Sequence, residues 1–333
     1  MLEHGGGVRA AAVRFAIPPE QWLDLSTGVN PFARLPEAIP APLWNRLPEA
    51  EDGLEAAARA YYGTPSLLPT AGSQAVIQAL PRLRPPGRVA VLHPAYAEHA
   101  HAWRQAGHAV ANLPLDALEA SLESFDAVTV VHPNNPTGQR LAPERLLEWR
   151  ERLARRGGWV VVDEAFIDPT PELSLAPWTP LPGLRVLRSL GKFFGLAGAR
   201  VGFLLAEPEL LARCQELLGP WSVAGPSRWA ARQALEDRPW QGENRLRLAA
   251  DARRLAALLA RWGLPPAAGT DLFQWVPTPA APAWWEGLAR RGILVRRFDD
   301  PSGLRFGLPG PEADWRRLAD ALAALQEALP PVG

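Results

Sequence analysis

Five short apolar runs, separated by helix-like segments, follow one another through the first two thirds of the chain. The runs cover residues 89–94, 127–133, 159–166, 184–190 and 201–206, and several of them end in polar residues. The intervening segments 97–107, 143–156 and 208–218 place apolar residues at helical spacing. This alternation predicts an α/β fold, with a mostly parallel central sheet flanked by helices. Active sites in such sheets collect at the carboxyl ends of the strands.

The pattern changes after about residue 235. A long helix (about 243–262), a strand (272–276), a helix near 284–292, two short strands and a last helix (about 311–328) predict a smaller α+β module. We therefore expect three parts. They are residues 1–45 as an N-terminal arm and part of a small domain, 46–235 as a large domain, and 236–333 as the small C-terminal domain.

Charge and cysteine content exclude several classes of function. The formal net charge is zero and the arginines are dispersed, so no basic surface is expected to attract nucleic acid. No stretch reaches the roughly 18 apolar residues of a membrane span. Cys214 is the only cysteine, which excludes an intrachain disulfide and fits a reducing compartment. We expect a cytoplasmic protein that binds neither nucleic acid nor membrane.

Lys192 is the only lysine among 35 Lys and Arg residues. A lysine amine can form an imine with a carbonyl group, whereas an arginine stays protonated and cannot. Lys192 follows the strand-like run 184–190 and precedes a glycine-rich segment. Ser189 and Arg200 lie nearby in the sequence, and together they could hold one phosphate. A solvated surface lysine is the ordinary alternative.

Other polar residues follow the remaining strand-like runs. Asp163 ends a run of three valines, and a partly buried carboxylate there could keep a heterocyclic nitrogen protonated. Asn135 lies in VVHPNNPTG, Tyr96 follows the run 89–94, and Ser73 and Gln74 begin a helix-like segment after glycine. Each has an ordinary explanation as a cap, turn or core-edge residue. Together with Lys192 they are the groups that pyridoxal 5′-phosphate requires.

The chain resembles the fold type I pyridoxal-phosphate enzymes from about residue 4 to 328. The resemblance is carried by the blocks NNPTG, DEAF and SLGKFFGLAGAR, and it is greatest with the branch that contains histidinol-phosphate aminotransferase and threonine-phosphate decarboxylase. It implies that Lys192 forms the imine with the cofactor, Asp163 pairs with the pyridine nitrogen and Asn135 contacts the ring 3′-oxygen. It also implies that Tyr96 stacks on the ring and that the phosphate is held by Ser73, Gln74, Ser189 and Arg200.

Two segments depart from the aminotransferase pattern. Phe166 replaces the tyrosine of DEAY, whose hydroxyl contacts the cofactor's 3′-oxygen, and DEAF followed by Ile-Asp is similar to the decarboxylase. RLPE at 46–49 stands where the family has RYPD, so Leu47 cannot make the hydroxyl contact to a neighbouring subunit's cofactor.

Further segments resemble the decarboxylase. They are His4, Gly5 and Gly6, which resemble an arm that closes over the substrate there, the stretch 23–32 with Asn30, and PWSV at 220–223. Of these residues, His4, Gly5, Gly6 and Asn30 are expected to bind substrate. By the same resemblance, Arg305 binds the substrate's α-carboxylate and Arg296 gives a second anion contact, for the substrate phosphate.

The resemblance therefore implies decarboxylation of L-threonine O-3-phosphate, a small phosphorylated amino acid, by a homodimer that uses pyridoxal 5′-phosphate. The product would be (R)-1-aminopropan-2-ol O-phosphate, used in cobalamin biosynthesis. An aminotransferase acting on histidinol phosphate or a related compound is the alternative. A non-catalytic ligand sensor is a remote one, because such regulators usually carry an added DNA-binding domain.

Overall fold

The computed structural model describes residues 4–327, which form two compact units. The first unit contains the described parts of Met1–Phe32, Pro136–Gly138 and Glu243–Gly333; the second contains Ala33–Asn135 and Gln139–Gly242. The sequence placed changes of domain after residues 45 and 235. In the structure the second unit ends at Gly242 and the first resumes at Glu243, inside helix α10 (Arg238–Arg261). The change of pattern near 235 therefore marks the start of this helix. The domain assignment itself stays a prediction.

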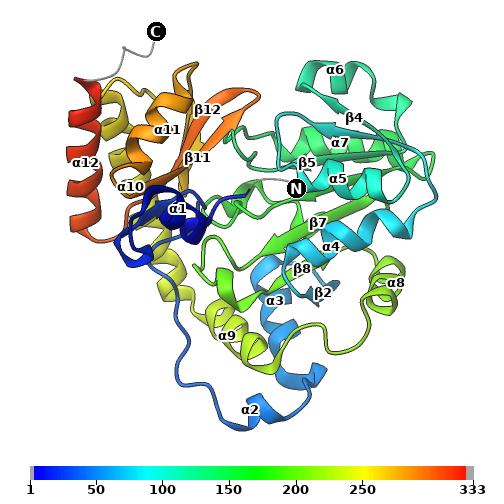
Figure 1. The fold of residues 1–333 in the computed structure, drawn as a ribbon. Helices are drawn as coiled ribbons and strands as arrows, with labels where there is room; N and C mark the ends of the chain where they lie inside the picture. The colour runs from blue at the N-terminus through cyan, green and yellow to red at the C-terminus, as the bar shows by residue number, and fades with distance from the viewer. Residues whose placement is uncertain (1–3, 328–333) are drawn as a thin grey trace. The chain divides into compact units, whose positions relative to one another are not determined.

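The second unit is built on a seven-stranded sheet in the order β2-β8-β7-β6-β5-β3-β4 (Figure 1). Strand β8 runs antiparallel to both of its neighbours, and the other neighbouring strands are parallel. The expected mostly parallel sheet is therefore confirmed, and the five apolar runs are its strands β3, β5, β6, β7 and β8. The strands are β2 Leu67–Thr70, β3 Arg88–Leu92, β4 Ala109–Leu113, β5 Ala127–Val131, β6 Trp159–Asp163, β7 Leu184–Ser189 and β8 Gly202–Leu205.

Helices bury the apolar strands of this sheet. Every residue of β5 and β6 is buried, as expected for parallel strands covered on both faces. Trp103 and Cys214 from two helices pack into the same core as Val161 of β6. The helices of this unit are α2 Pro42–Asn45, α3 Leu54–Tyr62, α4 Ser73–Ala79, α5 Glu98–Gln105, α6 Leu115–Ala120, α7 Pro143–Ala154, α8 Pro208–Leu218 and α9 Gly225–Glu236.

The first unit has a five-stranded sheet in the order β1-β11-β12-β10-β9. Strand β1 (Leu23–Leu25) comes from the N-terminal segment and pairs in parallel with β11 (Ile293–Asp299). Part of the expected arm is thus a strand of this unit. Its other elements are α1 Val8–Phe15, β9 Ala268–Thr270, β10 Phe273–Pro277, α11 Ala281–Ala289, β12 Ser302–Gly307 and α12 Glu312–Gln326.

No helix within residues 4–327 has the length and apolar character needed to cross a bilayer. Helix α10, the longest with 24 residues, carries arginine at both of its ends.

Candidate active site

Asp163 ends β6 and is almost fully buried, with 3% of its surface exposed. Its Oδ2 lies 2.8 Å from Nε2 of His99, and its Oδ1 accepts a hydrogen bond from the Ala165 amide at 3.0 Å. A buried carboxylate needs such partners because burial removes its hydration. The role of His99 was not predicted from the sequence. Its position one helical turn after Tyr96 was the available signal, and the two rings lie 6.2 Å apart at 82°.

Lys192 follows the end of β7 and is half-buried. Its Nζ lies 5.4 Å from the ring centroid of Phe166, which is itself buried. The structure therefore brings the only lysine next to the DEAF segment that begins at Asp163. The ring that meets the amine has no hydroxyl group, so the departure from DEAY changes a side chain in direct contact with Lys192.

The four residues expected to hold a phosphate lie around the start of α4. A Cβ added to Gly72, the residue before Ser73, would lie 2.6 Å from Nη2 of Arg200, so this guanidinium is close to the glycine backbone. Gly202 pairs with Ser189, and a Cβ on Gly202 would lie 2.4 Å from the Ser73 amide nitrogen. Arg200 has a φ of 53°, which is uncommon for a residue other than glycine. Ser73, Ser189 and Arg200 are thus neighbours, as an anion site requires.

Gln74 and Tyr96 are joined by a hydrogen bond. The Tyr96 hydroxyl donates to Oε1 of Gln74 at 3.4 Å, and Nε2 of Gln74 donates to Glu98 at 3.1 Å. Burial raises the pKa of Tyr96 to about 12, and the charges of Glu98 and Asp163 add to this effect. The tyrosine therefore stays a neutral, partly buried ring beside Asp163, as a residue that stacks on a heterocycle should.

Asn135 lies in the loop after β5, half-buried, next to the buried Asn134. Nδ2 of Asn134 donates to the Pro94 carbonyl at 2.7 Å, which links the loops after β5 and β3. Asn135 is therefore at the same sheet edge as Tyr96 and Asp163.

A buried ionic cluster lies directly beside these residues in the sequence. Arg188, which precedes Ser189, donates to Glu164 at 2.9 Å and also forms an ion pair with Asp168. Ser174 donates to Glu164 at 2.6 Å, and Tyr61 donates to Asp168 at 3.0 Å. Burial raises the pKa of Glu164, and the Arg188 charge partly offsets that rise. This cluster, also missed from the sequence, ties β7 to the segment that follows Asp163.

The residues expected to bind substrate all belong to the first unit. Arg296 of β11 and Arg305 of β12 are directly opposite each other in the antiparallel pairing. Arg305 is buried and donates from Nη2 to the Ser26 carbonyl at 2.5 Å. Burial, helped by the nearby Arg296 charge, lowers its pKa to about 10. Two cations that face each other repel, so this position is suited to an anion that separates them.

The N-terminal arm meets the same carbonyl. The Gly6 amide donates to Oγ of Ser26 at 2.7 Å, and a Cβ on Gly5 would lie 2.4 Å from the Ser26 carbonyl oxygen. The exposed His4 precedes these glycines. Asn30 is buried, and its Nδ2 donates to Asn244 at 3.1 Å while its Oδ1 accepts from the Phe32 amide at 2.9 Å. The roles assigned to these residues stay predictions.

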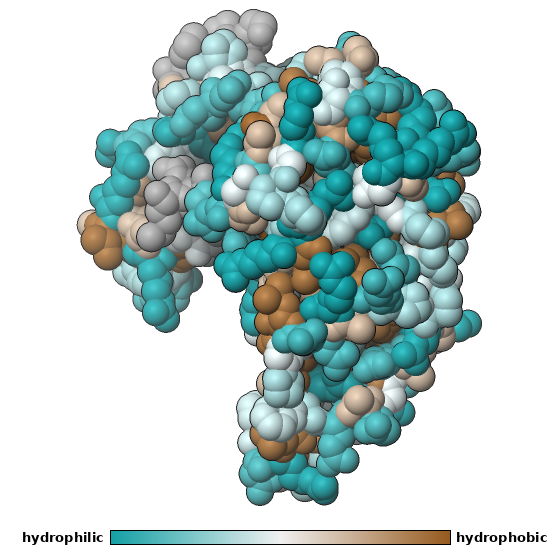
Figure 2. Space-filling view, turned by 90° about the vertical axis from the view of Figure 1, so that its right-hand side faces the viewer, coloured by the Kyte–Doolittle hydropathy of each residue, from teal (hydrophilic) through white to brown (hydrophobic). Residues whose placement is uncertain are grey.

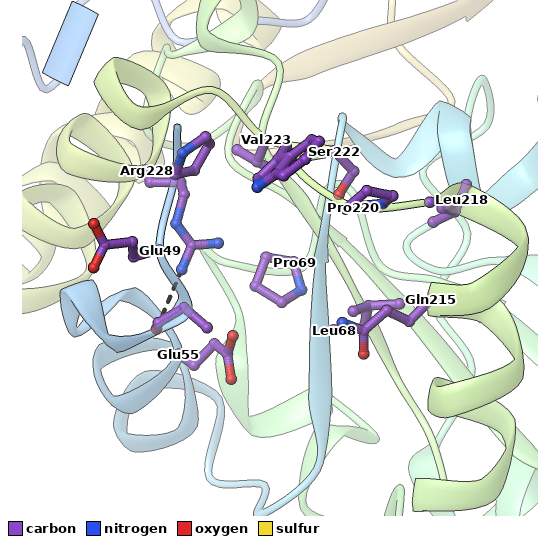
Figure 3. A pocket seen from close by; sticks show the side chains of 14 residues that line it. Glu49, Glu55, Leu68, Pro69, Gln215, Leu218, Pro220, Ser222, Val223 and Arg228 are labelled. Atoms are coloured by element: carbon purple, nitrogen blue, oxygen red, sulfur yellow. Dashed lines mark hydrogen bonds between the residues drawn. The ribbon is translucent and has the colours of Figure 1, made fainter. Parts of the chain in front are cut away.

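A separate cavity of about 110 Å³ lies in the second unit (Figure 3). The lining residues include Pro48 and Glu49 of the RLPE segment, Pro69 of β2 and Trp221 of PWSV, and Arg228 pairs with Asp52 beside it. None of the expected cofactor or substrate residues lines this cavity. Among residues 4–327, no cluster of His, Cys, Asp or Glu could hold a metal ion.

The sequence profile of the aminotransferase class I and II family matches residues 20–322. The chain is 57% identical to a threonine-phosphate decarboxylase from Pseudomonas aeruginosa over 98% of this chain and 99% of that protein. It is 44% identical to a threonine-phosphate decarboxylase from Sinorhizobium sp over 98% of each chain. Among solved structures, histidinol-phosphate aminotransferase from Sinorhizobium meliloti in complex with pyridoxal-5′-phosphate matches with a TM-score of 0.83 at 21% identity, over 97% of this chain and 95% of that one.

Proposed function

Because the chain belongs to the aminotransferase class I and II family, we propose that it is a pyridoxal 5′-phosphate-dependent decarboxylase of L-threonine O-3-phosphate. The products are (R)-1-aminopropan-2-ol O-phosphate and CO2, and the amine product serves as a linker in cobalamin biosynthesis. The observation that carries this proposal is the 57% identity to a threonine-phosphate decarboxylase over nearly the whole length of both chains.

The residues of the second unit fit the cofactor. A half-buried amine, a buried carboxylate and an arginine beside a helix start correspond to the aldehyde, the ring nitrogen and the phosphate of pyridoxal 5′-phosphate. When bound, the cofactor supplies an electron-accepting ring for the electrons released from a broken bond at Cα. The residues that would hold it are Lys192, Asp163, Asn135, Tyr96, Ser73, Gln74, Ser189 and Arg200.

Asp163 and Lys192 supply the charge and the proton that the reaction needs. His99 fixes the Asp163 carboxylate, which would pair with the protonated ring nitrogen. When the substrate binds, the Lys192 amine would give up its position to the amine of the substrate. It is then the group best placed by chemistry to return a proton to Cα after CO2 has left.

The arginines of the first unit would orient the substrate. Arg305 would bind the α-carboxylate and Arg296 the phosphate, and His4, Gly5, Gly6 and Asn30 would complete the site. By fixing the position of the α-carboxylate, Arg305 would decide which bond at Cα is broken, and so would favour loss of CO2 over loss of the Cα proton.

We assign the enzyme to the cytoplasm, in keeping with its single buried cysteine. We also propose that it acts as a homodimer through the surface around α2. Trp44, Leu47 and Trp221 are exposed by 68%, 62% and 59%, which is unusual for large apolar side chains. Brown, apolar surface is visible at the lower end of Figure 2, where α2 lies in Figure 1.

The test is turnover of threonine phosphate by the purified, cofactor-loaded protein, with and without an added keto acid. We expect CO2 and aminopropanol phosphate in both cases. A matched Lys192→Arg protein keeps the positive charge but cannot form an imine, so it should lose both turnover and the absorbance band of the bound cofactor. Amine exchange that requires the keto acid, without CO2, would instead identify an aminotransferase, the function that the family also contains.

A further inference from the structure

Ser26 contacts the N-terminal arm and Arg305 at the same time. It lies just after β1 and is 1% exposed. Its side-chain Oγ accepts the hydrogen bond of the Gly6 amide at 2.7 Å, while its carbonyl accepts that of Arg305 at 2.5 Å. One residue therefore holds both a segment of the arm and a buried guanidinium.

Asp24 fixes the direction of the Ser26 hydroxyl. Its Oδ1 accepts from the Ser26 hydroxyl at 2.6 Å and from the Ser26 amide at 2.9 Å. Because the hydroxyl hydrogen is used by Asp24, the Oγ lone pairs are left to accept from Gly6. Each residue in this series therefore orients the next: Asp24 orients the Ser26 hydroxyl, and the hydroxyl oxygen orients the Gly6 amide.

Gly5 packs directly on the carbonyl that orients Arg305. A Cβ at Gly5 would lie 2.4 Å from that oxygen, closer than side-chain atoms approach a backbone oxygen. Any larger residue would have to displace either the arm or the Ser26 carbonyl. Gly7 differs: its φ is −79°, and a Cβ there would meet no described atom within 4 Å.

We infer that Ser26 is a positioning residue that couples the docking of the His4-Gly5-Gly6 arm to the orientation of Arg305. This inference rests on the proposed function, in which Arg305 binds the substrate carboxylate. When the arm is seated, Gly5 covers the Ser26 carbonyl and keeps water from competing for it, so the guanidinium is held in one orientation. The arm thereby contributes to carboxylate binding through Arg305 as well as by covering the substrate.

Two pairs of variants of the cofactor-loaded enzyme test this inference. Ser26→Ala removes the Gly6 contact and should raise backbone amide exchange in residues 4–8. It should also raise KM roughly fivefold, the effect of one lost hydrogen bond, with kcat within about twofold. Ser26→Thr retains a hydroxyl and should restore both values. Gly5→Ala should raise KM roughly tenfold by displacing a charge-assisted contact, whereas Gly7→Ala should change neither exchange nor KM.

Unchanged amide exchange in Ser26→Ala would show that Ser26 does not hold the arm. Increased exchange with an unchanged KM would show that the arm is not coupled to Arg305. Equal effects of Gly5→Ala and Gly7→Ala would do the same. The exchange measurement needs no substrate, so it tests whether Ser26 holds the arm independently of the proposed function. The proposed function would be refuted by a different result, namely wild-type protein that releases no CO2 from threonine phosphate.

Discussion

Nε2 of His99 lies 2.8 Å from Oδ2 of Asp163, and the two side chains are 3% and 4% exposed. A histidine on α5 thus determines the orientation of the carboxylate that we assign to the cofactor's ring nitrogen. Hydrogen bonds to a buried charged group are stronger than those between neutral groups.

His99→Phe should therefore lower kcat/KM by about tenfold or more, the range for losing a hydrogen bond to a charged group. Cofactor should also dissociate more readily, which absorbance after dialysis measures. His101 lies on the same helix but is exposed, so His101→Phe is the matched control and should leave both values unchanged. Equal behaviour of the two variants would show that His99 does not support Asp163.

Removing Arg188 should destabilise the protein strongly. Glu164 and Asp168 would then be buried without their positive partner, a change that costs about 3–5 kcal/mol. We expect Arg188→Met to show this loss in denaturant unfolding at neutral pH.

The loss should also depend on pH. Burial raises the pKa of Glu164 above its ordinary value of 4.5, and without Arg188 the pKa rises further. The folded state then holds a proton that the unfolded state releases, so stability falls as the pH rises above 4.5 through the raised pKa. The double variant Arg188→Met/Glu164→Gln should lose the part of this dependence that Glu164 causes. A pH-independent difference between wild type and Arg188→Met would contradict the assignment to Glu164.

The opposed arginines of β11 and β12 should contribute differently to substrate binding. If Arg296 binds the phosphate, Arg296→Met should raise KM for threonine phosphate and reduce the preference for it over threonine. Arg305→Met should weaken the binding of threonine phosphate and of threonine to the same extent, because both compounds carry the carboxylate. Each loss should be about tenfold or more, as for a charge-assisted hydrogen bond. Competition kinetics with the two compounds measure the preference, and the reverse pattern would exchange the two roles.

The proposed dimer surface can be tested by adding a charge to it. Trp44→Asp should shift the sedimentation equilibrium toward the monomer, because a carboxylate in an apolar interface is costly to desolvate. Leu246 of α10 is a matched control, since it is 76% exposed and apolar but lies in the first unit. Leu246→Asp should leave the association state unchanged. A Trp44→Asp protein that sediments like wild type would exclude this surface.

The sequence was sufficient for features that depend on local pattern. The strands that end at Asp163 and at Ser189 are parallel neighbours. The placement of these two polar residues at one edge of the sheet could therefore be predicted from where the apolar runs end. Contacts between distant segments were not predictable in this way. His99 looks like any helical histidine until packing brings it to Asp163. The pairing of Leu23 with Ile293 joins residues from opposite ends of the chain, which no local periodicity can indicate.

Helix α10 shows how a local signal can be hidden. It begins at Arg238, before the expected start near 243, and its first turn contains a proline, which is compatible with a helix only at such an early position. Pro239 and Gly242 concealed this beginning from the periodicity. Arg188 was hidden for a different reason, since an arginine inside an apolar strand becomes informative only once its two buried carboxylates are known.

Half-buried Lys192 next to Phe166 gives the chain an unusual practical property. Since every other Lys or Arg residue is an arginine, reagents that modify amines can attach to this chain only at Lys192, which we assign to the cofactor, and at the α-amino terminus. An acylating probe would therefore label Lys192 and the α-amino group, and protection of Lys192 by bound cofactor would make its labelling rate a direct titration of cofactor occupancy. The same property makes the enzyme unsuited to immobilisation through surface amines, a procedure that would consume the lysine to which we assign the imine with the cofactor.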